Sequence, residues 1–96
     1  MPRALMLVQA TITDPAAWGA YAKASGPVMS KWGAELIVKP DSLEVLEGQS
    51  RPRVVVFAFE SMEKARGFWN SPEYAELKAM RIGAGEADFL LLEEAR

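Results

Sequence analysis

The feature that most constrains the fold of this 96-residue chain is a set of predicted strands that are apolar on both faces. Side chains alternate between the two faces of a strand, and in residues 4–12 the set that starts at Leu5 and the set that starts at Met6 are both largely apolar. Residues 53–60 and 87–93 repeat this two-sided pattern. Such strands are typical of a sheet that is covered on both sides.

Residues 15–32 are predicted to form a helix. Asp14 is suited to cap the free N–H groups at its start, and Pro15 is suited to the first helical position. Pro27 lies inside the helical pattern without breaking its phase, which predicts one kinked helix rather than two elements, and Gly33 is a suitable end. The residues of one face recur at spacings of three and four: Trp18, Tyr21, Ala22, Ser25, Val28, Met29 and Trp32.

The remaining segments continue an alternation of strands and helices. Residues 35–39 are predicted to be a short strand that resumes over residues 43–46, as one bent strand or as two short ones. Ser61 caps a second helix, which restarts at Ser71 and continues to Arg81. With the strands already described, the order is β-α-β-β-α-β, which predicts a single α+β domain with a ferredoxin-like antiparallel sheet.

A fold of this kind leaves one face of its sheet without a helical cover. Two helices cover one face of a four-stranded sheet, and the apolar second face needs another layer. Two copies of the chain that pack sheet on sheet would supply that layer, so we expect a homodimer. The alternative is a monomer whose second face is a moderately apolar surface in contact with water.

The composition restricts the chemistry that the chain can perform, because it contains neither cysteine nor histidine. This excludes disulfides, thiolate nucleophiles, iron–sulfur clusters and the usual zinc and haem ligands. No pair of acidic residues has the spacing of a metal site, so we expect neither a metal nor a cofactor. Any catalysis must use carboxylates, tyrosine, lysine, arginine, serine, backbone groups or a bound molecule.

The charge and the N-terminal region exclude further classes of partner. A formal net charge of −2 gives no electrostatic basis for binding nucleic acid or an acidic membrane surface. Phe57 and Phe59 alternate as aromatics do in RNA-recognition domains, but the glycines of that motif are missing. The apolar run over residues 4–8 is too short for a membrane helix or a secretory signal. We therefore expect a cytoplasmic location.

Several stretches of the chain resemble one family of small bacterial proteins. They are residues 21–33, residues 43–48, the strand over residues 54–59, and the Asn70-Ser71-Pro72-Glu73-Tyr74 element that is followed by Arg81. In these stretches, which span most of the chain, the sequence resembles the bacterial "domain of unknown function 1330" family of the dimeric α+β barrel superfamily. The Ser71-Pro72-x-Tyr74 element with Arg81 is the most specific part of the likeness.

This resemblance implies a ferredoxin-like fold that pairs face to face with a second copy, and it implies no particular reaction. The wider superfamily includes cofactor-free monooxygenases, small isomerases, haem enzymes and proteins without known catalysis. A shared fold does not decide among these functions. The lack of histidine separates the chain from relatives that hold haem through that residue.

Two groups of residues on the predicted helices are candidates for a ligand site. Tyr21 lies beside Trp18 on the inward face of the first helix, and the resembling family carries a tyrosine at the matching place. Its phenol either donates a hydrogen bond into a pocket or belongs to the core with an internal partner. Tyr74 and Arg81 share a stripe of the last helix, where Arg81 either clamps a carboxylate or pairs with a nearby acid such as Asp88.

Other polar residues have plainer explanations beside their functional ones. Lys78 on the same stripe is expected to be solvated, and Ser71 is explained by its role as a helix cap. Glu47 at a strand end is a candidate ligand-binding residue or general base if it is buried, and otherwise a turn acid. Gln9 and Thr11 share one face of the first strand, where they either line a small polar cavity inside the barrel or mark the wet end of the strand.

Three classes of function remain open from the sequence. The first is a dimer that binds a small, anionic organic molecule, or a cofactor-independent enzyme. Its pocket would lie between helices and sheet, lined by Trp18, Tyr21, Trp69 and Tyr74 with Arg81 as the anion anchor. The second is a non-catalytic dimer, stress-related or regulatory, that recognises another protein. A subunit that supports a separate catalytic chain is a third possibility.

Overall fold

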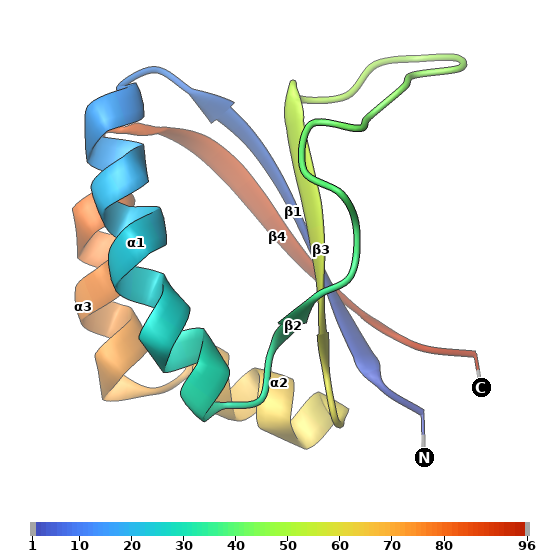
Figure 1. The fold of residues 1–96 in the computed structure, drawn as a ribbon, viewed down its shortest axis with the longest axis vertical. Coiled ribbons are helices and arrows are strands. Elements are labelled where there is room, and N and C mark those ends of the chain that lie inside the picture. Colours follow the sequence, from blue (N-terminus) through green and yellow to red (C-terminus); the bar gives the residue numbers. More distant parts are fainter. Residues whose placement is uncertain (1, 96) are drawn as a thin grey trace.

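A computed structural model describes residues 2–95, and within them four strands form one antiparallel sheet with helices on one side (Figure 1). The strand order is β2-β3-β1-β4, and the fold is the ferredoxin-like βαββαβ fold predicted from the sequence. The elements are β1 (Ala4–Ile12), α1 (Pro15–Lys31), β2 (Glu35–Leu36), β3 (Arg53–Phe59), α2 (Met62–Trp69), α3 (Pro72–Arg81) and β4 (Gly85–Glu93). None of the described helices is long and apolar enough to cross a membrane.

The helices begin where the sequence places their caps. The backbone N–H of Ala17 donates to the Asp14 carboxylate at 3.2 Å, and that of Tyr74 donates to the Ser71 hydroxyl at 3.1 Å. Ser61 caps α2 in the same way. Each such cap contributes about 1 kcal/mol to helix stability. α1 continues as a single helix through Pro27, as the unbroken apolar phase predicts.

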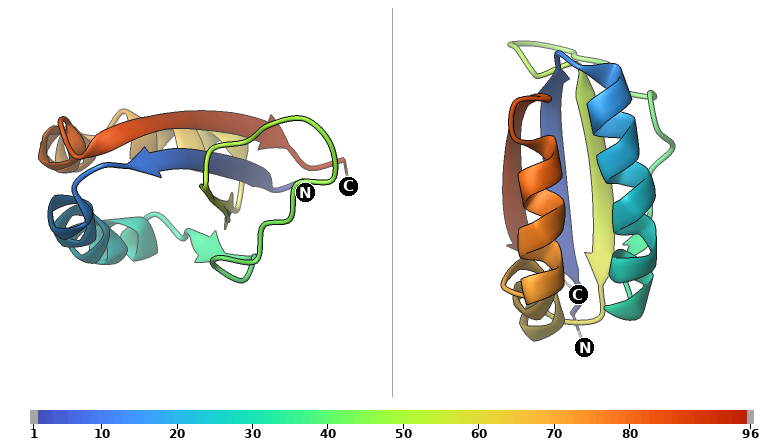
Figure 2. Two further views of the ribbon diagram at one scale, coloured as in Figure 1. Left: turned by 90° about the horizontal axis from the view of Figure 1, so that it is seen from above. Right: turned by 90° about the vertical axis from the view of Figure 1, so that its left-hand side faces the viewer.

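The register of the sheet separates two apolar faces. Val8 of β1 pairs with Val55 of β3 on one side and with Phe89 of β4 on the other, and these three side chains share the face toward the helices. The next position, Leu7, pairs with Leu90 on the opposite face. Every helix lies on the first face, which holds the core, and none of the described elements covers the second (Figure 2). The second face is called the open face below.

The segment between β2 and β3 differs from the prediction. The strand predicted over residues 35–39 is reduced to the two residues of β2, and residues 43–46 form an exposed loop instead of a strand. A strand needs a hydrogen-bonding neighbour, and β2 reaches β3 only as far as the N–H of Ile37, which donates to the carbonyl of Val56 at 3.1 Å. Beyond it Pro40 has no N–H to donate, and Asp41 takes a left-handed backbone conformation with φ 61°.

This loop leaves the sheet on the side opposite to the helices (Figure 1). It carries three exposed apolar side chains, Leu43, Val45 and Leu46, of which Leu46 is 88% exposed. The loop and the open face therefore present apolar groups to the same side of the molecule.

Two helical glycines differ sharply in what surrounds them, which yields a matched pair of substitutions. A Cβ on Gly67 of α2 would lie 2.6 Å from the Trp32 ring, whereas a Cβ on Gly19 of α1 would meet no atom within 4 Å. Alanine is favoured over glycine in a helix by about 1 kcal/mol, and overpacking costs about 1–3 kcal/mol. We expect Gly19→Ala to raise the free energy of unfolding and Gly67→Ala to lower it, by about 1 kcal/mol each. Urea unfolding at one protein concentration measures both, and shifts of the same sign would contradict the packing of Trp32 on α2.

Candidate functional site

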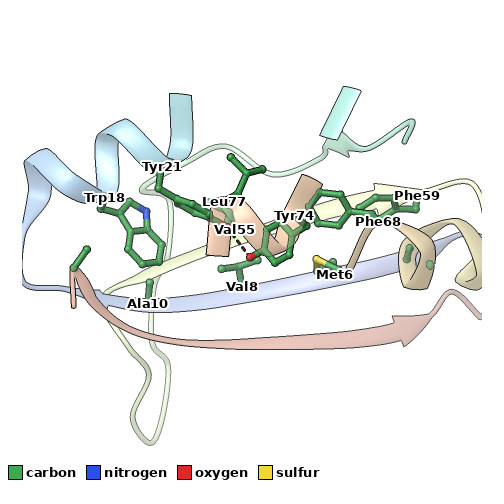
Figure 3. Close-up of a cluster of buried hydrophobic side chains, with 13 residues drawn as sticks. Met6, Val8, Ala10, Trp18, Tyr21, Val55, Phe59, Phe68, Tyr74 and Leu77 are labelled. Carbon is green, nitrogen blue, oxygen red and sulfur yellow. Dashed lines mark hydrogen bonds between the residues drawn. The ribbon is translucent and has the colours of Figure 1, made fainter. Parts of the chain in front are cut away.

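The two tyrosines of the chain form a buried pair of hydroxyls between α1 and α3. The Oη atoms of Tyr21 and Tyr74 lie 2.9 Å apart, within hydrogen-bond distance. Figure 3 shows both rings above β1 with their hydroxyls directed toward one another. Tyr74 is 1% exposed, so its hydroxyl lies out of reach of solvent. The pair joins residues that are 53 positions apart in the sequence.

Arg81 supports this pair from the end of α3. Its Nε donates to Tyr74 Oη at 3.2 Å, and its guanidinium carbon lies 4.4 Å from the centre of the Phe89 ring. The acid that the sequence suggested as its partner, Asp88, instead accepts a hydrogen bond from Arg51 at 2.8 Å. Within the described residues no carboxylate lies close enough to form an ion pair with Arg81. The guanidinium is therefore held by the phenol and by the face of an aromatic ring.

The other predicted aromatic residues surround the tyrosines. The ring centres of Trp18 and Tyr21 are 5.3 Å apart, and those of Trp69 and Tyr74 are 5.1 Å apart. Lys78 holds its ammonium 4.9 Å from the centre of the Trp69 ring, so this side chain is engaged rather than simply solvated. Five of the six predicted ligand-binding residues thus form one contiguous cluster: Trp18, Tyr21, Trp69, Tyr74 and Arg81.

The cluster divides two separate depressions. The first, here called the α1 cleft, has a volume of about 170 Å³ and lies between α1 and the helix-side face of the sheet. The second, here called the β4 groove, is wider and more open, with about 590 Å³ along β4 and α3. Trp18 and Tyr21 line the α1 cleft, whereas Trp69 and Arg81 line the β4 groove. Tyr74 is buried between the two and lines neither.

Glu47 is not part of this arrangement. It lies in the exposed loop between β2 and β3, on the open side of the sheet, and no hydrogen bond or ion pair joins it to the rest of the described chain. Its side chain is exposed, so the burial expected of a general base at this position is absent.

Sequence reasoning missed two polar residues of the α1 cleft, Ser25 and Arg53. The Ser25 hydroxyl donates to the carbonyl of Ala22 in its own helix at 2.9 Å. Arg53 makes a long contact of 3.7 Å with Asp41. The position of Arg53 could have been predicted from the alternation of side chains in β3. This alternation places Arg53 on the same face as Val55, and therefore under α1.

A polar network occupies one end of the open face. Arg51 donates to Thr11 Oγ1 at 3.0 Å and to Asp88 at 2.8 Å, and it also contacts Glu86 at 3.3 Å. Gln9 lies beside this network on the same face. The two polar residues singled out in β1 thus lie where the open face becomes hydrophilic. Within residues 2–95 no group of three or more acidic side chains converges as a metal site would require.

The buried environment changes the acidity of Tyr21. Burial raises the pKa of Tyr21 far above its ordinary value, the hydrogen bond with Tyr74 raises it further, and the nearby Arg81 cation opposes both effects only in part. The phenol therefore remains neutral across the physiological range. In this state it acts as a hydrogen-bonding group and not as a general base.

This shift predicts the behaviour of the protein in alkali. The folded state holds the Tyr21 proton more tightly than the unfolded state does. The contribution of this group to the free energy of unfolding is therefore fully present below pH 10 and is lost as the pH rises above 10. In the variant Tyr74→Phe, Tyr21 is the only tyrosine, so the ultraviolet absorbance of tyrosinate reports it alone. We expect ionisation near pH 10 in concentrated urea, and in native buffer only together with unfolding. Tyrosinate that forms near pH 10 with native circular dichroism would contradict the burial of this phenol.

Comparison of the backbone with solved structures returns proteins of the same fold. A protein of unknown function from Rhodopseudomonas palustris, RPA0582, matches with a TM-score of 0.79 and 18% identity over 99% of this chain and 84% of that one. SnoaB from Streptomyces nogalater, a cofactor-independent oxygenase, matches with a TM-score of 0.67 and 12% identity over 100% and 95%. A dimeric protein of unknown function with a ferredoxin-like fold from Bacteroides fragilis matches with a TM-score of 0.63 and 13% identity over 95% of both chains. At these identities the likeness establishes the fold and no activity.

Comparison of the sequence assigns a family. No curated protein matches the chain at a significant level. The family model described as "Domain of unknown function (DUF1330)" matches residues 3–95, which is nearly the whole chain and includes the Tyr21, Tyr74 and Arg81 cluster. The chain therefore belongs to the DUF1330 family.

Proposed function

We propose that this protein is a homodimer that binds a small, largely apolar organic molecule in the α1 cleft of each subunit. The observation that carries the proposal is the cleft itself, in which apolar walls surround a few polar groups. Ligand sites of proteins typically combine these two features. The walls come from α1 and from the helix-side face of the sheet, and include Val8, Trp18, Met29, Val55, Phe57, Phe68 and Phe89.

The size and the polar groups of the cleft indicate the class of ligand. Its volume of about 170 Å³ is close to that of a cavity of about 150 Å³ that is known to hold benzene. One aromatic ring with a small substituent therefore fits. Arg53 is half-exposed at the cleft, and its single 3.7 Å contact with Asp41 is a weak surface ion pair that a ligand carboxylate can replace. We therefore assign the anion-binding role to Arg53, while Arg81 holds the buried phenols.

The open face supports the proposed dimer. Leu90 and Leu92 are 43% and 54% exposed there, next to the partly exposed Leu5 and Leu7. The loop between β2 and β3 lies on the same side of the sheet and carries exposed apolar side chains (Figure 1). Packing the open faces of two copies would remove these side chains from water, at about 25 cal/mol for each Å² of apolar surface buried. A structural neighbour with the ferredoxin-like fold is described as dimeric, which agrees with this arrangement.

The neighbours also agree with binding of an organic molecule in this fold, since SnoaB is described as a cofactor-independent oxygenase. This chain has no histidine or cysteine, so a reaction on the bound molecule would rely on tyrosine, arginine or the reactivity of the molecule itself. Binding is accordingly the function that we propose. Oxygen consumption can be assayed with the ligand once that ligand has been identified.

The dimer is tested by a charge on the open face. Leu90 on the open face and Met80 on α3 are almost equally exposed, at 43% and 42%, so Met80→Glu is a matched control for Leu90→Glu. We expect sedimentation velocity to give a dimer for the wild type and for Met80→Glu, and a monomer for Leu90→Glu. A buried carboxylate without a partner is costly enough to separate the subunits. A wild-type protein that sediments as a monomer at micromolar concentration would contradict the proposed dimer.

The cleft is tested by filling it. Ser25 lines the cleft, and Ser30 is exposed on the same helix, so Ser25→Phe and Ser30→Phe add the same ring in two places. With phenylacetate as the probe, ligand-observed NMR is expected to detect binding to the wild type and to Ser30→Phe. We expect at least a tenfold loss of affinity in Ser25→Phe. Equal binding by the two variants would locate the ligand outside the α1 cleft.

A further inference from the structure

The direction of the hydrogen bond between the two tyrosines follows from the number of donors and acceptors around them. An arginine side chain has donors only, so Tyr74 Oη must accept the bond from Arg81 Nε. The Tyr74 hydroxyl also has one proton of its own, which needs an acceptor because the group is 1% exposed. Within the described residues the only acceptor in reach of that proton is Tyr21 Oη, at 2.9 Å. Tyr74 therefore donates to Tyr21.

The proton that is left without an acceptor is therefore that of the Tyr21 hydroxyl. Its oxygen accepts the bond from Tyr74, so its own O–H must point to a different acceptor. No other group of residues 2–95 accepts a hydrogen bond from this hydroxyl. Tyr21 is buried, and it lines the α1 cleft. A buried hydroxyl that makes no bond is costly, so the favourable acceptor is an atom of the molecule in the cleft.

We infer that Tyr21 donates its phenolic proton to an acceptor oxygen of the ligand, such as a carbonyl or a deprotonated phenolic oxygen. This inference rests on the proposed function and specifies its ligand. Arg81 and Tyr74 are positioning residues in this arrangement, because they orient the Tyr21 hydroxyl without touching the ligand. The positive charge of Arg81 at the far end of the chain of bonds polarises both hydroxyls toward the cleft.

The other polar groups of the cleft complement this donor. The proton of Ser25 is already used in the bond to the Ala22 carbonyl, so this side chain offers the ligand only lone pairs. Arg53 is half-exposed in the lining of the cleft, where its guanidinium supplies a positive charge. Tyr21 thus supplies a neutral hydroxyl donor at the cleft. The matching ligand is a single aromatic ring with an acceptor oxygen directed at Tyr21 and, where it has one, a carboxylate directed at Arg53.

The inference is tested with two probes of the same shape, acetophenone and α-methylstyrene. α-Methylstyrene carries a methylene group at the position where acetophenone has its carbonyl oxygen. We expect the wild-type protein to bind acetophenone about tenfold more tightly, as one hydrogen bond from a buried donor implies. The variant Tyr21→Phe/Tyr74→Phe removes both hydroxyls and keeps the shape of the rings. We expect it to bind the two probes with equal affinity.

The outcomes separate this inference from the proposed function. If the wild type binds both probes equally, or if the double variant keeps the preference for acetophenone, Tyr21 is not the donor, although the cleft is still a binding site. If neither probe binds and phenylacetate also fails, the proposed function falls, and the inference falls with it. A preference that appears in the wild type and disappears in the double variant supports the inference.

Discussion

The structure depends on a sheet that is apolar on both faces and covered on only one. The helices bury the face that includes Val8 and Val55, and this burial creates the core in which the aromatic side chains meet. The opposite face leaves Leu90 and Leu92 about half-exposed. Burial of apolar surface is the dominant favourable term in both folding and association. One pattern of alternation therefore accounts for the core of the subunit and for the surface on which we propose that two subunits pair.

The contact between α1 and α3 determines the chemistry of the covered side. It brings the only two tyrosines together in a place from which water is excluded, and it encloses the bond from Arg81 to Tyr74. In such an environment each donor must find an acceptor, so the hydrogen bonds acquire a direction. Arg81, which the sequence suggested as an anion anchor, lines the other depression and holds Tyr74. Arg53 and Tyr21 are the polar groups of the α1 cleft that we propose donate to a ligand.

Most of the fold could be predicted from local patterns, and the exceptions have a common cause. The strand over residues 4–12 and the caps at Asp14, Ser61 and Ser71 agree with the structure, since alternation and capping depend on neighbours in the sequence. The strand predicted over residues 43–46 is wrong, because a strand forms only where another strand offers hydrogen bonds. Alternation reports which side chains avoid water, and in this segment they have no partner within the described chain.

The candidate site shows the same division between local and long-range information. Local patterns in the sequence specify the order of elements, the two-sided sheet and the helical stripe that aligns Tyr74 with Arg81, and the composition specifies the absence of histidine and cysteine. Long-range packing brings Tyr74 to Tyr21 of another helix, pairs Asp88 with Arg51 and makes the aromatic cluster separate two depressions. The physical reason is that helical and strand periods specify which face a residue occupies. The partner across that face depends on how distant segments pack.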